Sequence, residues 1–129
     1  MKLKKMKRSL LFVLLIPAIL FVFVSVSHSQ HTVAQLTNNA NPDGRPQINN
    51  NGHVVWYGHD GSDYEIFLYD GASTTQLTNN AHSDWNPQIN NTGYVVWYGS
   101  DGSDAEIFLY DGASTTQLTN NSYDDSRSA

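Results

Sequence analysis

A block of 41 residues occurs twice in tandem in this chain, and this repeat constrains the fold more than any other feature. Segments 35–75 and 76–116 are identical at 33 of 41 positions, and their opening Gln-Leu-Thr-Asn-Asn returns a third time at 117–121. A tandem period of this length is typical of arrays in which one supersecondary unit stacks on its own copies. The sequence therefore predicts a repeat architecture over residues 30–129, with two full repeats at 35–75 and 76–116 and the start of a third at 117–129.

The first 29 residues have the layout of a secretory signal peptide. A basic segment is followed by an apolar stretch from Leu10 to Val26, and serines then stand at the two positions that a signal peptidase reads. An uncleaved membrane anchor is the alternative, but this apolar run is shorter than about 20 residues and contains Pro17. We therefore expect residues 1–29 to be removed and the remaining chain to be periplasmic or extracellular.

Removal of that segment leaves a strongly acidic chain without lysine. Its basic residues are Arg45 and Arg127, against twelve Asp and Glu, which gives a net charge of −10 (2 − 12). Such a chain repels phosphate backbones, so no nucleic-acid partner is expected, whereas a basic protein partner or a divalent cation suits it. The chain has no cysteine, which excludes disulfides, thiol catalysis and cysteine metal sites.

Each repeat is predicted to form four short antiparallel strands. In the first repeat we expect these strands at 47–49, 53–57, 64–69 and 72–78. The second and third are the strongest, because they are rich in β-branched and aromatic residues. Asn51-Gly52 and Asp70-Gly71 predict two-residue hairpin turns, and residues 79–86 are expected to connect one unit to the next.

The two strong strands are apolar on both faces, whereas a sheet with one wet face alternates apolar and polar residues. Each sheet is therefore expected to have a neighbour on both sides, as in a β-propeller with four strands per blade. A β-solenoid is the alternative, but tight hairpins favour antiparallel blades. The expected fold is all-β: a partial β-propeller with two four-stranded antiparallel blades of 41 residues and an extra N-terminal outer strand at 32–37.

Three motifs, 46–56, 60–71 and 76–78, together resemble the WD40-like (PD40-type) repeat of TolB-like β-propeller proteins. That repeat has a Pro, a Ser-Pro-Asp-Gly turn, an apolar strand, a polar glycine-containing loop, Ile-Tyr, an Asp and a closing Leu-Thr. Here Asn-Asn-Asn-Gly at 49–52 and Asn-Asn-Thr-Gly at 90–93 replace Ser-Pro-Asp-Gly, which keeps the turn chemistry. The resemblance covers 32–129 and implies an extracytoplasmic interaction domain without catalytic residues.

Two blades do not close a ring, because propellers typically have about four to eight. Arg127 falls in register with Arg45, so the sequence stops just before a third blade. Repeat arrays need roughly three units or polar capping repeats for stability. We therefore expect either a fragment of a longer propeller or a chain that completes a ring by assembling with copies of itself.

The positions at which the two repeats differ gather near one end of the predicted blades. Six of the eight differences lie there: Asn41/His82, Pro42/Ser83, Gly44/Trp85, Arg45/Asn86, His59/Ser100 and Tyr64/Ala105. The other two, Asn51/Thr92 and His53/Tyr94, belong to the opposite end. Loops on a rigid scaffold commonly carry binding, although loops also drift after duplication.

We define the binding rim as twelve residues at the first of these ends. They are Asn41, Asp43, Arg45, His59, Asp60, Asp63, His82, Asp84, Trp85, Asn86, Asp101 and Asp104. Within this rim, Trp85 is a candidate anchor for a peptide or a sugar ring. The alternative is that it packs on the neighbouring blade.

The Asp-Gly-Ser-Asp loops contain the only residues that suggest a metal. Asp60, Asp63, Asp101 and Asp104 are calcium candidates, with Glu65 and Glu106 two residues further on. Calcium takes about six to eight oxygens, and the EF-hand spacing is absent. The simpler expectation is that these Asp side chains cap their own turns, with no cofactor. The histidines do not form a set with zinc-ligand spacing.

The sequence contains no nucleophile elbow, no His-Glu-x-x-His and no phosphate-binding glycine loop. The first functional expectation is therefore an exported, non-enzymatic propeller module for protein–protein interaction. The alternatives are the propeller portion of a secreted carbohydrate-active enzyme or peptidase, and a calcium-dependent carbohydrate-binding module.

Overall fold

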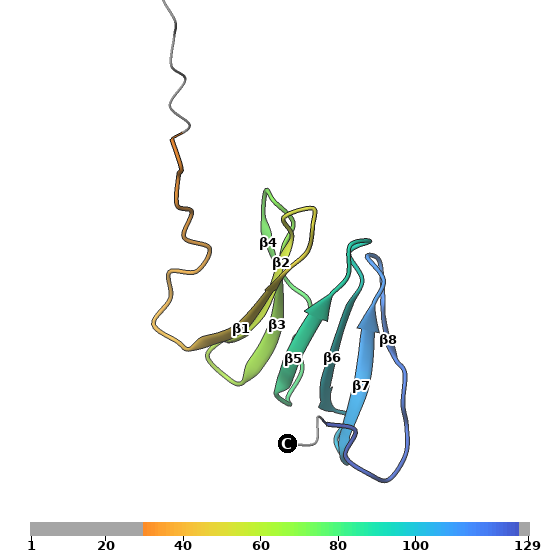
Figure 1. Cartoon of the computed structure of the whole chain (residues 1–129). Coiled ribbons are helices and arrows are strands. Elements are labelled where there is room, and N and C mark those ends of the chain that lie inside the picture. The colour runs from red at the N-terminus through yellow and green to blue at the C-terminus, as the bar shows by residue number, and fades with distance from the viewer. Residues whose placement is uncertain (1–29, 127–129) are drawn as a thin grey trace, which may run out of the picture. The chain divides into compact units, whose positions relative to one another are not determined.

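The computed structural model describes residues 30–126, so the signal-peptide prediction for residues 1–29 and the register of Arg127 lie outside the described residues. From Val33 onward the chain forms one compact unit that contains two four-stranded antiparallel sheets (Figure 1). The first sheet consists of β1 (Asp43–Ile48), β2 (Val54–His59), β3 (Tyr64–Tyr69) and β4 (Thr74–Gln76). The second consists of β5 (Asp84–Ile89), β6 (Val95–Ser100), β7 (Ala105–Tyr110) and β8 (Thr115–Gln117). The predicted all-β class with two four-stranded antiparallel sheets is confirmed.

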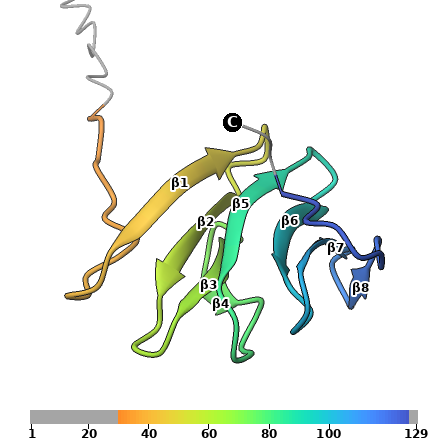
Figure 2. The ribbon, with the colours of Figure 1, turned by 90° about the horizontal axis from the view of Figure 1, so that it is seen from below.

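Each strand pairs with the next one along the chain, in the orders β1-β2-β3-β4 and β5-β6-β7-β8. Successive antiparallel strands alternate direction, so the β2–β3 loop and the connection from β4 to β5 lie at the same end of the structure. The β1–β2 and β3–β4 turns lie at the opposite end. Between the sheets, β5 approaches β1, β2 and β3, and Figure 2 shows β1 and β5 next to each other.

The first strand of each sheet begins earlier than the sequence predicted. β1 starts at Asp43 and β5 at Asp84, and a bulge interrupts the register of each strand between Gly44 and Gln47 and at the equivalent place in β5. Arg45 lies in this bulge with a φ of 49°. Pro46 follows Arg45 in β1, which is an edge strand. Proline has no N–H to donate to a ladder, and a bulge in an edge strand accommodates it. The positions 44–45 and 85–86 therefore lie in strands rather than in the predicted loops.

The two hairpin turns of the repeat differ in type. The backbone N–H of Asn49 donates to the carbonyl of His53 at 3.0 Å, and Gly52 has a φ of 81°. This is a three-residue loop with glycine in the left-handed position, so the two-residue prediction was wrong here. The Asn49 side chain explains the longer loop, because its Oδ1 accepts the N–H groups of Asn51 and His53 at 3.0 Å. The second turn has two residues as predicted, but they are Gly71 and Ala72 instead of Asp70 and Gly71, because Asp70 N donates to the carbonyl of Ser73.

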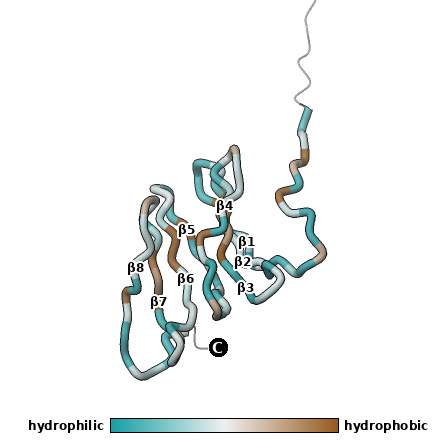
Figure 3. Tube along the Cα trace, turned by 180° about the vertical axis from the view of Figure 1, so that it is seen from behind, coloured by the Kyte–Doolittle hydropathy of each residue, from teal (hydrophilic) through white to brown (hydrophobic). Residues whose placement is uncertain are grey.

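The core lies between the two sheets. Val55 and Ile66 of the first sheet and Val95 and Trp97 of the second form one buried cluster. Partly buried residues complete it: Tyr57, Leu68, Leu77, Ile89, Phe108 and Tyr110. Figure 3 shows hydrophobic stretches along the strands and hydrophilic turns at both ends. Packing of one apolar sheet face on another is what the two-faced apolar strands predict.

The extra N-terminal outer strand is not present, because the structure has no strand between residues 30 and 42. A strand needs a partner ladder for its N–H and C=O groups, and no described strand pairs with this segment. Leu36 and Thr37 instead line a cavity of about 200 Å³ with Val54 and Trp56. Between residues 30 and 126 no helix that could cross a membrane was found.

Candidate functional site

The binding rim lies at the end that carries the β2–β3 and β6–β7 loops, and its twelve residues differ in exposure. Asn41, Asp43, Arg45, Asp60, His82 and Asp101 are exposed, His59, Asp63, Trp85, Asn86 and Asp104 are half-buried, and Asp84 is buried. The segment before β1 is tied to the rim, because Asn41 Nδ2 donates to the carbonyl of His59 at 3.1 Å. The structure therefore brings the predicted residues to one end but does not present all of them to solvent.

Asp84 holds the start of the second sheet together. It is 2% exposed, and its Oδ1 accepts the indole N–H of Trp97 at 3.0 Å. Its Oδ2 accepts the side-chain amide of Asn80 at 2.8 Å. Burial raises the pKa of Asp84 above its usual value, and these hydrogen bonds oppose that shift. Asp84 acts as a structural acceptor inside the protein.

Glu65 lies beside Asp84 and is fully buried. One of its carboxylate oxygens accepts the N–H of Asn80 at 2.9 Å, and the other accepts the hydroxyl of Thr78. Burial raises the pKa of Glu65 to about 7, and the nearby Asp84 carboxylate adds to the shift. This pair was not predicted from the sequence, although the threefold Thr-Asn-Asn repeat marks the residues that contact it.

Trp85 packs on the first sheet. Its ring centroid lies 4.9 Å from that of Tyr57 and 4.3 Å from that of Tyr64, and the His59 ring meets Tyr64 edge-on at 5.1 Å. The positions equivalent to His59, Tyr64 and Trp85 in the next unit hold Ser100, Ala105 and Ser126. Three differences between the repeats thus build one aromatic cluster, and Trp85 belongs to packing rather than to an exposed anchor.

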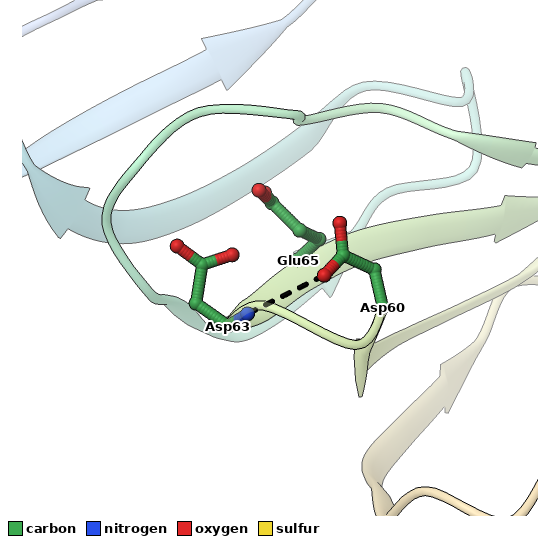
Figure 4. Close-up of side chains that lie close together, drawn as sticks. All are labelled: Asp60, Asp63 and Glu65. Carbon is green, nitrogen blue, oxygen red and sulfur yellow. Dashed lines mark hydrogen bonds between the residues drawn. The ribbon is translucent and has the colours of Figure 1, made fainter.

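Two acidic triads occupy equivalent places at the rim. In each triad, Asp60–Asp63–Glu65 and Asp101–Asp104–Glu106, one oxygen from every carboxylate lies within 4.8 Å of the others. Figure 4 shows the three side chains of the first triad, with the bond from Asp63 N to Asp60. The predicted turn capping is confirmed for Asp60, whose Oδ1 accepts Ser62 N at 2.8 Å, and for Asp101, whose Oδ1 accepts Ser103 N at 2.9 Å. These bonds hold the pKa of both Asp60 and Asp101 below the usual range.

A cavity of about 570 Å³ lies beside the second sheet, bordered by residues of β1, β5, β6 and β7 and of the segment after β8. It is lined by Arg45, Gln47, Asn86, Gln88, Val96, Trp97, Tyr98, Ile107, Asp125 and Ser126. Two of these, Arg45 and Asn86, are predicted rim residues, and both have left-handed φ values in their bulges. The other lining residues were not predicted, although the apolar pattern on both faces of the strand at 95–98 was a signal for Val96, Trp97 and Tyr98.

No family model matches the chain, and neither the search of curated proteins nor that of solved structures found a match. The chemistry of the rim and the packing of the sheets therefore carry the functional argument alone.

Proposed function

We propose that the chain is part of a TolB-like β-propeller and acts as an exported, non-enzymatic module for protein–protein interaction. Its interaction surface is the free face of the second sheet. The partner is another sheet of the same kind, supplied by a second copy of the chain.

The observation that supports this proposal is that equivalent residues of the two repeats form a covered face in the first sheet and a free face in the second. Tyr57 and Ile66 are direct neighbours on the face of the first sheet that the second sheet covers. Tyr98 and Ile107 are the equivalent neighbours in the second sheet, and they line the open cavity. The free face is therefore shaped and composed like a face that already binds a sheet in this molecule.

The opposite side of the pair supplies the complementary face. The second sheet covers the first with Trp97 and Phe108, whose rings stack with centroids 6.0 Å apart. On the outer side of the first sheet, Trp56 and Phe67 stack in the same way at 5.9 Å. Two different surfaces that fit each other give head-to-tail association between copies of a chain. Such an assembly closes into a ring when the rotation from one copy to the next adds up to a full turn.

Contacts between neighbouring units join residues at equivalent positions of the repeat. Asn49 Nδ2 donates to the carbonyl of Asn90 at 3.0 Å, which joins equivalent turns of the two sheets. Leu77 packs on the cluster that contains Trp97, and Leu36 lines a cavity with the equivalent Trp56. The segment around Leu36 thus occupies the place that the last strand of a preceding sheet would take.

The proposal is tested by measuring the mass of the full-length chain, expressed with its own N-terminal segment, by sedimentation velocity over a range of concentrations. We expect association that increases with concentration. Ile107→Glu places a charge on the free face and should leave a monomer, because burying an unpaired charge is strongly unfavourable.

Thr115→Glu is the matched control, because Thr115 is exposed on the short strand β8. This variant should associate like the parent chain, and far-UV circular dichroism should show the same strand content for all three proteins. A parent chain that stays monomeric at every concentration and unfolds cooperatively contradicts the proposal.

A further inference from the structure

The second acidic triad contains buried carboxylate oxygens that have no hydrogen-bond donor among residues 30–126. Glu106 is fully buried, and its Oε1 accepts the N–H of Asn121 at 2.7 Å, whereas its Oε2 has no partner. Both carboxylate oxygens of Asp104 are also buried and without a partner. Burial of a carboxylate oxygen is costly unless a donor or a cation lies against it.

Further negative charge surrounds this triad. Burial raises the pKa of Asp104, and the charges of Glu106, Asp101, Asp124 and Asp125 raise it further. Asp124 is held in place because its Oδ1 accepts the N–H of Ala105 at 3.0 Å. After residue 29 the chain has only two basic residues, Arg45 and Arg127, so it has few cations of its own to offset five carboxylates.

The first triad has the same residues but satisfies most of its oxygens internally. Both carboxylate oxygens of Glu65 accept hydrogen bonds, one from Thr78 and one from Asn80. In this triad only Oδ1 of Asp63 is buried without a partner. Ser83 stands where the second triad has Asp124, and its hydroxyl accepts the N–H of Tyr64 at 3.3 Å. The two triads therefore differ in how many oxygens remain available to a ligand.

We propose that the Asp101–Asp104–Glu106 triad is a binding site for a hard divalent cation, calcium, and that Asp104 and Glu106 supply its buried oxygens. Calcium accepts several carboxylates in an irregular shell, whereas magnesium requires near-octahedral geometry and keeps most of its waters. Asp101 contributes from the exposed side of the same site. The Asp60–Asp63–Glu65 triad binds the ion more weakly, because Glu65 is already engaged. This inference does not depend on the proposed association.

The experiment is a calorimetric titration of the chelator-treated full-length chain with calcium chloride, and with magnesium chloride for comparison. We expect one calcium per chain with a dissociation constant of about 10⁻⁴ to 10⁻³ M, the range of extracellular calcium modules. Asp104→Asn keeps the shape of the side chain and should weaken this binding at least about tenfold, since it removes a charged ligand. Asp63→Asn, the equivalent change in the first triad, is the matched control and should leave that binding intact.

Thermal unfolding supplies a second measurement. Calcium should raise the Tm of the parent chain because it binds the folded state, and this shift should be lost in Asp104→Asn and retained in Asp63→Asn. The proposal is overturned if neither heat nor a Tm shift is seen at about 10 mM calcium, well above the expected constant. It is also overturned if Asp63→Asn, and not Asp104→Asn, removes the binding.

Discussion

The two sheets are nearly identical in sequence but have very different surroundings. Ile66 is fully buried between the sheets, whereas Ile107, at the same place in the next repeat, is only half-buried beside an open cavity. Asp84 is 2% exposed, and the equivalent Asp43 in the first repeat is exposed. The comparison shows that a residue in a repeat array takes its role from the neighbouring unit as much as from its own unit.

The largest expected effect comes from truncating the same isoleucine in each sheet. Ile66→Ala leaves a cavity in a packed core and should lower the free energy of unfolding by about 3 kcal/mol. Ile107→Ala removes side-chain atoms that are already partly in water and should lower it by less than about 1 kcal/mol. Urea unfolding at low protein concentration measures both values.

Equal losses for the two variants would break the comparison, because they would mean that Ile107 is as well packed as Ile66. The proposed association sharpens the same test. If the free face receives a second copy, the effect of Ile107→Ala should grow with protein concentration while that of Ile66→Ala should not.

A smaller effect is expected at the glycines that face the first aspartate of each sheet. A Cβ at Gly99 would collide with Oδ1 of the buried Asp84. The carboxylate of Asp84 accepts hydrogen bonds from the side chains of Trp97 and Asn80. Gly99→Ala should therefore lower the free energy of unfolding by about 2 kcal/mol, since a buried carboxylate loses hydrogen bonds.

Gly58→Ala is the matched change in the first sheet. Its Cβ would meet the Phe67 ring at 3.2 Å and Oδ1 of Asp43, whose carboxylate is exposed and accepts one hydrogen bond, from Asn39. We expect a smaller loss than at Gly99, and thermal unfolding of the two variants side by side measures the difference. An equal or larger loss at Gly58 would show that the aspartate contact is not the cause.

Much of the architecture could be predicted from the sequence, because its strongest signals are local. The strands around Trp56 and Phe67 are β-branched and aromatic, and their two apolar faces predict stacked sheets. The start of β1 was missed because Asp43, Gly44 and Arg45 carry no strand pattern and lie before a bulge. The N-terminal strand was predicted from its likeness to the last strand of the repeat, but a strand forms only where a partner is present.

The candidate site was less predictable, because burial reversed the usual behaviour of charged residues. Glu65 and Glu106 lie in strands where an acidic residue would normally face water. Their burial depends on donors from a segment about fifteen residues later, such as the N–H groups of Asn80 and Asn121. Sequence spacing alone could not show that one glutamate would be fully satisfied and the other would not.

The last expected effect is a pH dependence to which Glu65 of the first sheet contributes. The folded-state pKa of Glu65, about 7, lies above its ordinary value of 4.5. The folded protein therefore binds a proton more tightly than the unfolded chain, so this group stabilises the fold fully below pH 4.5 and loses that contribution as the pH rises through 7. We expect the free energy of unfolding to fall over this window and then to level off.

Glu65→Gln isolates this contribution, because an amide of the same shape does not titrate. The difference in unfolding free energy between the parent chain and Glu65→Gln should change between pH 4.5 and 7, because only the parent chain has a titrating group at position 65. The aspartates with lowered pKa values, such as Asp60 and Asp70, lose their stabilising effect only as the pH falls below their ordinary value of 3.8 and so do not enter this window. A difference that stays constant across the window would mean that Glu65 is ionised in the folded protein.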